Sequence, residues 1–247
     1  MEFSFRLPLL DDYGVFILAG IAGVLFVLEW IIPLRRQSHA RLKRYKNNVL
    51  LSLIGMPAAR LLLLPLSYFW AAYLVQLNFG LLNWLELPLW ADVLLGCLAL
   101  DYAIYLWHRI NHHWPFLWRF HNVHHIDLNM DISTGIRFHF GEMLLSIPFR
   151  LLAIALFGVS PFAILLYEII FEAATLFHHS NIKLPKKLER GLAYIMITPR
   201  QHGIHHSIVK RESNSNFGTV LNLWDKLHAT AVRNVPQSAI TIGIPGY

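Results

Sequence analysis

Long apolar segments alternate with short polar segments from position 13 to position 177. The first apolar run covers 13–33, and its length is enough to cross a hydrocarbon core of about 30 Å as one helix. The second run, 49–77, is interrupted by Pro57 and Pro65 and carries Arg60. It predicts a kinked crossing, made of one tilted helix or of two shorter pieces. A third run at 89–107 leads directly into His108 and predicts another transmembrane helix.

Two further apolar segments, 143–157 and 161–177, are separated only by Gly158, Val159 and Ser160. Each is short for a full crossing, so together they predict a helical hairpin that is either fully spanning or re-entrant. The expected fold class is an all-α integral membrane protein with about four to five transmembrane or re-entrant helices. The polar segments 109–142 and 180–247 should form one helical cap under these helices. Neither a repeat nor a linker is visible, so 1–247 is expected to be a single domain, with N-terminal transmembrane helices in 1–88.

The basic residues indicate how the helices are oriented. The densest basic stretch, RRQSHARLKRYKNN at 35–48, follows the first run and predicts a cytoplasmic segment by the positive-inside rule. The N-terminus is then expected outside. The first run has no basic n-region before it and no small-residue cleavage site, so it is expected to be an uncleaved anchor. Because a hairpin returns to the side it left, the cap and all the histidine clusters are expected on the cytoplasmic side.

Composition supports a multi-pass membrane protein and limits its chemistry. Apolar residues make up 55% of the sequence and charged residues only 15%. The net charge of +6 comes from basic residues beside the apolar runs, without the basic face and stacking aromatics of a nucleic-acid-binding protein. Cys97 is the single cysteine, which excludes an internal disulfide and a thiolate metal cluster. Any metal chemistry therefore falls to histidine.

Histidines with the spacing of metal ligands form three clusters. In the first, His108-Arg-Ile-Asn-His112, positions i and i+4 share one face of a helix. In the other two, positions i, i+3 and i+4 place three rings on one stripe if the segment is helical. Thr198-Pro199 supplies an N-cap and a first-turn proline ahead of the last cluster. These two clusters are His121, His124 and His125, and His202, His205 and His206.

The full set of histidines favours two metal ions, because eight imidazoles exceed the four ligands of a structural zinc site. Any single pair can equally be a polar helix face, and a histidine-rich tract can serve in metal storage. Imidazole binds iron, zinc, copper and nickel alike, so the ligands alone do not name the metal. The sequence lacks the motifs of carboxylate di-iron bundles, zinc metalloproteases, serine hydrolases and nucleotide-binding loops. Electrons for a redox reaction must then come from another protein.

These clusters occur together with STGIRFH (133–139), FHHSN (177–181), TPRQHGIHHS (198–207) and NFGTVLNLWDKL (216–227). In this combination the chain resembles the fatty acid hydroxylase and sterol desaturase superfamily over about 98–230. The resemblance implies a membrane-bound di-iron oxygenase with two iron ions as cofactor and no built-in flavin or haem. Such an enzyme uses O₂ and an external electron donor of the cytochrome b5, ferredoxin or reductase type. It hydroxylates or desaturates a C–H bond of a lipid such as a fatty acyl chain, a sterol or an isoprenoid.

The resemblance also implies that the eight clustered histidines are metal ligands, with no catalytic residue beyond the ligands themselves. His179 is a ninth expected ligand, because it shares a helical stripe with Glu168, Glu172 and Thr175. Some relatives have a further ligand histidine where this chain has Thr175. His139 and His178 are the two candidates to replace it, and each can equally be a hydrogen-bonding residue of the cap.

Two aspartates are expected to support the ligands. Asp101 lies on the same stripe of the third run as His108 and His112, and an ionisable group within a membrane helix is rarely without a role. It is predicted to accept the second N–H of a ligand imidazole, with an ion pair to Arg60 or Arg109 as the alternative. Asp225 is predicted to do the same for the third cluster.

The function expected from the sequence is lipid hydroxylation or desaturation by an oxidoreductase whose active site faces the cytoplasm. Two alternatives remain open at this point. One is a zinc-dependent hydrolase acting on membrane lipids, in which the metal generates hydroxide. The other is a carrier of metal or haem without catalysis, although its ligands would be expected along a membrane pathway and not beyond the helix ends.

Overall fold

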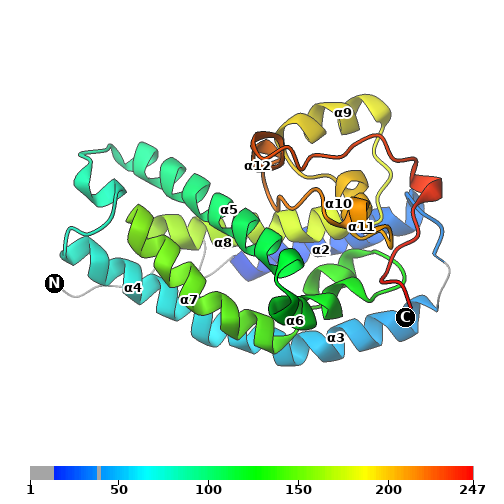
Figure 1. The fold of residues 1–247 in the computed structure, drawn as a ribbon, viewed down its shortest axis with the longest axis horizontal. Helices are drawn as coiled ribbons and strands as arrows, with labels where there is room; N and C mark the ends of the chain where they lie inside the picture. The colour runs from blue at the N-terminus through cyan, green and yellow to red at the C-terminus, as the bar shows by residue number, and fades with distance from the viewer. Residues whose placement is uncertain (1–13, 38–39, 247) are drawn as a thin grey trace.

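The computed structural model describes residues 14–37 and 40–246, and this part of the chain is helical with only isolated β-bridges (Figure 1). The predicted fold class is confirmed, because five helical segments are long and apolar enough to cross a membrane. These segments are α2 (Gly14–Ile31), Arg41–Gln76, α5 (Leu89–His113), α7 (Phe140–Phe157) and α8 (Pro161–His179). Helix α2 falls within the predicted run 13–33, while position 13 and the sequence before it lie outside the described residues.

The second crossing is one continuous helical path and not two separate pieces. It consists of α3 (Arg41–Ala58), one π-helical turn (Ala59–Leu63) and α4 (Leu64–Gln76). The wider turn lies between Pro57 and Pro65, where the missing backbone N–H groups interrupt the regular hydrogen-bond ladder. The predicted kink is therefore accommodated without ending the helix.

Helix α3 begins at Arg41, within the basic stretch and before the predicted start at 49. Its polar first half is held by the cap: Arg44 forms buried ion pairs with Asp127 at 2.6 Å and with Asp131 at 2.5 Å. Asn48 also donates to Asp127, at 2.9 Å. Apolar length alone could not place this helix end, because tertiary hydrogen bonds stabilise it.

The hairpin formed by α7 and α8 reaches the end of the bundle that lies opposite the cap (Figure 1). Its turn at Gly158 (φ 68°) packs on Gly80 (φ 106°) in the connection between α4 and α5, and Leu81 N–H donates to the carbonyl of Leu156 at 3.1 Å. A Cβ on Gly80 would lie 2.4 Å from the Cα of Gly158, so only glycine permits this approach. The hairpin thus extends as far as the neighbouring helices, as expected of a full crossing.

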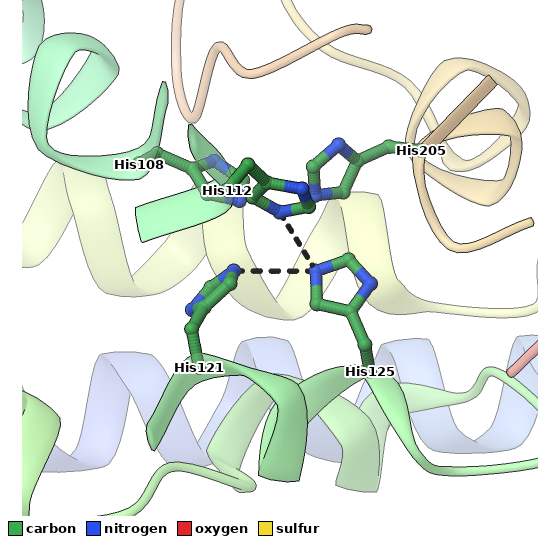
Figure 2. Close-up of side chains that lie close together, drawn as sticks. All are labelled: His108, His112, His121, His125 and His205. Atoms are coloured by element: carbon green, nitrogen blue, oxygen red, sulfur yellow. Dashed lines mark hydrogen bonds between the residues drawn. The ribbon is translucent and has the colours of Figure 1, made fainter. Parts of the chain in front are cut away.

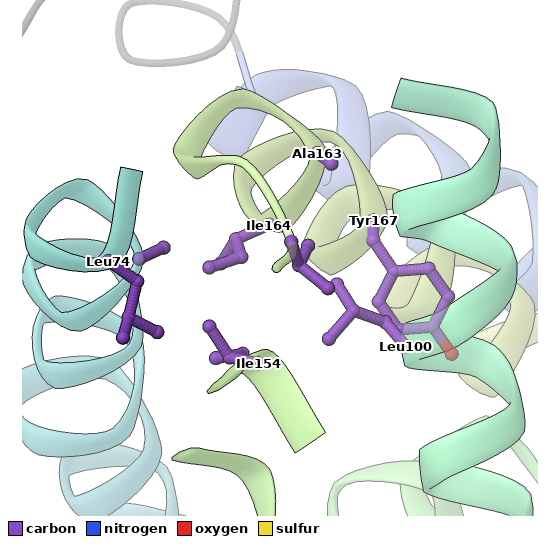
Figure 3. Close-up of a cluster of buried hydrophobic side chains, with 8 residues drawn as sticks. Leu74, Leu100, Ile154, Ala163, Ile164 and Tyr167 are labelled. Atoms are coloured by element: carbon purple, nitrogen blue, oxygen red, sulfur yellow. The ribbon is translucent and has the colours of Figure 1, made fainter. Parts of the chain in front are cut away.

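The apolar core lies where four of these helices meet. Figure 3 shows Leu74 on α4, Leu100 on α5 and Ile154 on α7 facing Ile164 and Tyr167 on α8. All five side chains are at most 3% exposed. This packing holds α4, α5, α7 and α8 together in the part of the bundle that lies towards the hairpin turn, away from the cap.

Apart from the short η2 (Leu82–Trp84) in the connection between α4 and α5, the remaining helices form a cap at the other end of the bundle (Figure 1). Glu29 on α2 is fully buried and accepts hydrogen bonds from the backbone N–H groups of Ile132 and Asn181, so it ties the first crossing to the cap. The cap helices are α6 (Pro115–His125), η3 (Ile132–Ile136), α9 (Lys186–Ile195), α10 (Pro199–His205), α11 (Lys210–Ser213), α12 (Leu223–Leu227) and η4 (Gln237–Ala239).

Candidate metal centre

Four helix ends bring the histidines to one place beneath the bundle. Helix α5 continues past the predicted run and ends at His113, so His108 and His112 lie on its last turns. Helix α6 follows at once with Pro115 in its first turn and carries the second cluster. Helix α10 begins at Pro199, and the side chain of Thr198 before it forms the predicted N-cap as part of a capping box. The end of α8 adds His178 and His179.

The nine histidines expected as ligands separate into two compact groups. In each group, one ring nitrogen of every member lies within 4.8 Å of the others. Figure 2 shows the first group, with rings from α5, α6 and α10 facing one another. The first group is His108, His112, His121, His125 and His205, and the second is His124, His179, His202 and His206.

The division between the groups follows helical spacing but crosses the sequence clusters. His121 and His125, at i and i+4, belong to the first group, while His124 between them points to the second. The third cluster divides in the same way, with His205 in the first group and the others in the second. Spacing predicts which rings share a face, but only the packing of the helices determines which faces meet.

Backbone carbonyls fix the orientation of several imidazoles. The Nδ1 atoms of His108 and His205 contact the carbonyls of Phe217 at 2.8 Å and Ser215 at 2.7 Å. In the second group, Nδ1 of His124 contacts the Arg137 carbonyl at 3.1 Å, and Nδ1 of His179 contacts the Thr175 carbonyl at 2.8 Å. A carbonyl can only accept, so Nδ1 carries the proton in these rings and Nε2 presents a lone pair.

The Nε2 lone pairs of these imidazoles lie close together, an arrangement that a bound cation would stabilise. Nε2 of His179 lies 3.0 Å from Nε2 of His124, although neither nitrogen has a proton to donate. In the first group, Nε2 of His108 and of His205 are buried without a hydrogen-bond partner among the described residues. Clustered lone pairs in a buried site are unfavourable unless a metal ion accepts them. The residues therefore fit two imidazole-bound metals.

Burial keeps these imidazoles in the form that binds metal. Outside the candidate membrane spans, burial and then the neighbouring rings hold the pKa of His124, His125, His202 and His206 well below the usual histidine value. Burial likewise lowers the pKa of His205, against the effect of its bond to Ser215. These rings are thus neutral at pH 7 and available as ligands without first losing a proton.

One supporting carboxylate was not predicted from the sequence. Oε1 of Glu142, in the first turn of α7, lies 2.9 Å from Nδ1 of His121, and both side chains are buried. This is the carboxylate partner that commonly orients a metal-binding histidine. A charged residue directly before the predicted run at 143 was the available signal, but nothing in the sequence places it beside the second cluster.

The two aspartates were predicted to contact ligand imidazoles, and this is wrong. Asp101 accepts hydrogen bonds from Tyr167 at 2.9 Å, from the Trp224 indole at 2.7 Å and from backbone N–H groups at 220 and 221. Asp225 accepts from the backbone N–H groups of Phe217 and Gly218. Both carboxylates hold the segment 217–224, and the carbonyl of Phe217 in turn orients His108. The two aspartates therefore support the ligands indirectly, through the backbone of this segment, and not by direct contact with an imidazole.

The two candidates to replace a ligand at Thr175 lie outside both groups. His139 is the N-cap of α7, where its Nδ1 accepts from the N–H of Gly141 at 3.0 Å. His178 is buried beside His202, with its ring centroid 4.1 Å away, and its Nδ1 donates to the carbonyl of Thr219. Both have the hydrogen-bonding role that was the alternative for them.

A cavity of about 140 Å³ reaches both groups from within the helical bundle. Two rings of the first group and three of the second line it, namely His108, His121, His124, His179 and His202. Apolar side chains such as Leu100, Ile104, Trp107, Phe149 and Phe171 form much of its remaining wall. An apolar molecule can therefore approach the histidines from the membrane side.

Comparison with known proteins gives one family match and several relatives. The family model described as fatty acid hydroxylase matches residues 93–230, more than half of the chain. Ornithine lipid hydroxylase OlsE of Rhizobium tropici is 34% identical over 160 residues, which are 64% of this chain and 47% of that protein. Cholesterol 25-hydroxylase of Rattus norvegicus is 28% identical over 157 residues, covering 60% of this chain and 49% of that protein.

Alkylglycerol monooxygenase of Danio rerio is 28% identical over 156 residues, covering 60% of this chain and 32% of that protein. The chain thus spans about half the length, or less, of these three relatives. No solved structure matches the chain.

Proposed function

Because the chain belongs to the fatty acid hydroxylase family, we propose that it is a membrane-bound oxygenase that hydroxylates a C–H bond of a lipid. The printed names of its relatives include lipid hydroxylases and monooxygenases, which supports an oxidoreductase over the zinc hydrolase and the metal carrier. A sterol, a fatty acyl chain, an isoprenoid or an amino lipid would each suit the proposal. Desaturation of the same bond is the related outcome.

The observation that carries this proposal is the pair of all-histidine groups, whose members are buried or half-buried, beside an apolar cavity. We assign five ligands to one metal and four to the other, and we take the whole chain as one domain built around them. Bound at these positions, two iron ions would supply the activation of O₂ and the attack on the C–H bond. Iron is proposed over zinc because zinc has no redox chemistry.

The chain's own residues have three tasks in this scheme. Carbonyls such as those of Phe217 and Ser215 keep Nδ1 protonated, so that Nε2 points inward without rotating. Glu142 does the same for His121. The apolar wall holds the lipid and keeps bulk water from the reacting centre.

We propose that the histidine centre faces the cytoplasm, with the N-terminus outside. The five candidate spans and the basic stretch at 35–48 support this orientation. Electrons would then arrive at the cap from a cytoplasmic carrier of the cytochrome b5, ferredoxin or reductase type.

The test is metal analysis of the purified protein together with lipid mass spectrometry of cells that express it. We expect two irons per chain and a lipid heavier by one oxygen. His205→Ala and His202→Ala should each reduce the iron content towards one and abolish the product, with membrane insertion unchanged. His113→Ala is the matched control, because His113 is exposed on the same turn of α5 as His112. Two zincs and a product formed without O₂ would contradict the proposal.

A further inference from the structure

Helices α9 and α12 carry an exposed apolar surface on the part of the cap that contacts α5 (Figure 1). The α9–α12 surface consists of Leu188 and Ile195 on α9 and of Leu223 and Leu227 on α12. These four side chains are between 41% and 67% exposed. A group of large exposed apolar side chains usually marks a site of contact with a membrane or with another protein.

The two helices are joined so that these side chains form one surface. The backbone N–H of Asn222 donates to the carbonyl of Ile195 at 2.9 Å, and Lys226 Nζ donates to the carbonyl of Tyr194 at 2.5 Å. On each helix the two apolar residues repeat on one side, at i and i+7 on α9 and at i and i+4 on α12. The end of α9 therefore meets the start of α12, and the backbone of Ile195 lies next to that of Leu223.

The bonds between α12 and α5 place this surface at the level of a membrane span. The Trp224 indole on α12 donates to Asp101 at 2.7 Å, and its ring contacts Tyr102 with the centroids 4.9 Å apart. At about 1.5 Å per residue, Asp101 lies about 18 Å along α5 from Leu89, where the candidate span begins. A hydrocarbon core is about 30 Å thick, so α12 contacts α5 within the thickness of the bilayer and not beyond it.

The exposed side of α5 leads directly to α12. Leu94, Leu98 and Tyr102 follow at i, i+4 and i+8 and therefore share one side of the helix. Leu94 is exposed, Leu98 is half-buried and Tyr102 contacts Trp224. The α9–α12 surface thus continues the side of α5 that is available to lipid.

The exposed charges around this surface are all basic. In 183–197 and 220–233 the two acidic side chains, Glu189 and Asp225, are buried. Apolar side chains bordered by lysine and arginine are typical of a helix that lies in the interface of an anionic leaflet. A second copy of the chain, docked here through the same surface, would bring like charges together. The exposed charged residues are Lys183, Lys186, Lys187, Arg190, Lys226 and Arg233.

We propose that the α9–α12 surface binds the anionic membrane leaflet on the side of the cap. Its leucine and isoleucine side chains enter the acyl region, and Lys187, Arg190 and Lys226 contact the phosphates of the lipid headgroups. The cap is then held against the bilayer beside α5 in addition to its attachment to the crossings. The inference does not depend on the proposed function, because it concerns how the cap meets the membrane and not what the histidine centre does.

Fluorescence from labelled positions tests this in the full chain. In a Cys97→Ala background, Ile195→Cys, Leu227→Cys and Val209→Cys each receive a nitrobenzoxadiazole label. The labelled proteins are placed one copy per disc in nanodiscs of phosphatidylcholine and phosphatidylglycerol. Lipids with a spin label on the acyl chain quench a fluorophore only where it lies in the membrane. We expect quenching at 195 and 227 and none at 209, where Val209 is an apolar cap residue of similar exposure (49%) at the start of α11.

The label at position 195 also reports the headgroup. Spin-labelled phosphatidylglycerol should quench it more strongly than the same fraction of spin-labelled phosphatidylcholine. A basic residue near a membrane surface favours an anionic lipid by about fivefold, so Lys187→Gln/Arg190→Gln should reduce the preference by at least that factor. Lys210→Gln/Arg211→Gln makes the same charge changes on α11 and should keep it.

Two kinds of result would overturn the inference. The first is a label at 195 and 227 that the spin-labelled lipids do not quench, whether its emission is that of water or is shifted by contact with another protein. The second is equal quenching by the two lipids, or a preference that survives in the Lys187→Gln/Arg190→Gln protein.

Discussion

Replacement of Glu142 should weaken one metal position and leave the other intact. Its carboxylate contacts the ligand imidazole of His121, in the five-histidine group, at 2.9 Å. In Glu142→Ala the Nδ1–H of His121 would lose its acceptor in a buried site, which frees the ring to rotate. Loss of such a partner typically costs about 10–100-fold in metal affinity, or about 1.4–2.8 kcal/mol.

The assay is chelator competition followed by metal analysis, which gives a separate dissociation step for each metal. We expect one of the two steps to shift by the stated factor in Glu142→Ala and by less in Glu142→Gln, whose amide oxygen can still accept. Glu86→Gln, at an exposed position before α5, is the control. If both metals bind Glu142→Ala as tightly as the wild type, the carboxylate does not orient His121 and the reasoning is refuted.

Three further predictions concern stability and are read by thermal unfolding. A Cβ on Gly203 would lie 1.6 Å from Nη2 of Arg35, which donates to the carbonyl of Pro199 in the cap. Gly203→Ala should therefore lower the free energy of unfolding by about 1–3 kcal/mol. Adding Arg35→Ala to that variant should cost less than Arg35→Ala alone, and strict additivity would count against a clash. Gly80→Ala should also lower the free energy of unfolding by about 1–3 kcal/mol, because its Cβ would meet the backbone of the hairpin turn. An unchanged melting temperature would show that the turn adapts. Burial opposes ionisation of Asp127, but the bonds and charge of Arg44 hold its pKa below the usual value. Its stabilisation is therefore present above about pH 3.9 and lost as the pH falls through the lowered pKa. In Asp127→Asn the melting temperature should fall less steeply with decreasing pH on the acid side. An unchanged acid dependence would be the contrary result.

Much of the fold could be predicted because its signals are local. Apolar length and composition predicted the crossings, and the N-cap at Thr198 was expected from two adjacent residues. The start of α3 at Arg41 was missed because Arg44 is stabilised by Asp127, far away in the chain. A side chain whose partner is distant in sequence leaves no periodic signal.

The candidate site, like the fold, could be predicted only in part. Residue type and helical spacing were enough to select the nine histidines that the structure brings together. They were not enough to assign His124 and His125 to different groups, because adjacent residues on α6 point to different neighbours. The orienting partners were also missed: Asp101 holds a loop, and Glu142 and backbone carbonyls contact the rings.

By itself, the sequence determined the helices, the membrane character and the set of histidines, since each follows from the order of residues within one segment. Only the tertiary structure decided how those histidines divide between two groups and which atoms orient them. It also decided that Arg150 and Glu168 meet in the wall of the cavity. The physical reason is that ligand geometry depends on the packing of α5, α6, α8 and α10, and the carbonyls that orient the rings are present in every residue and have no signature in sequence.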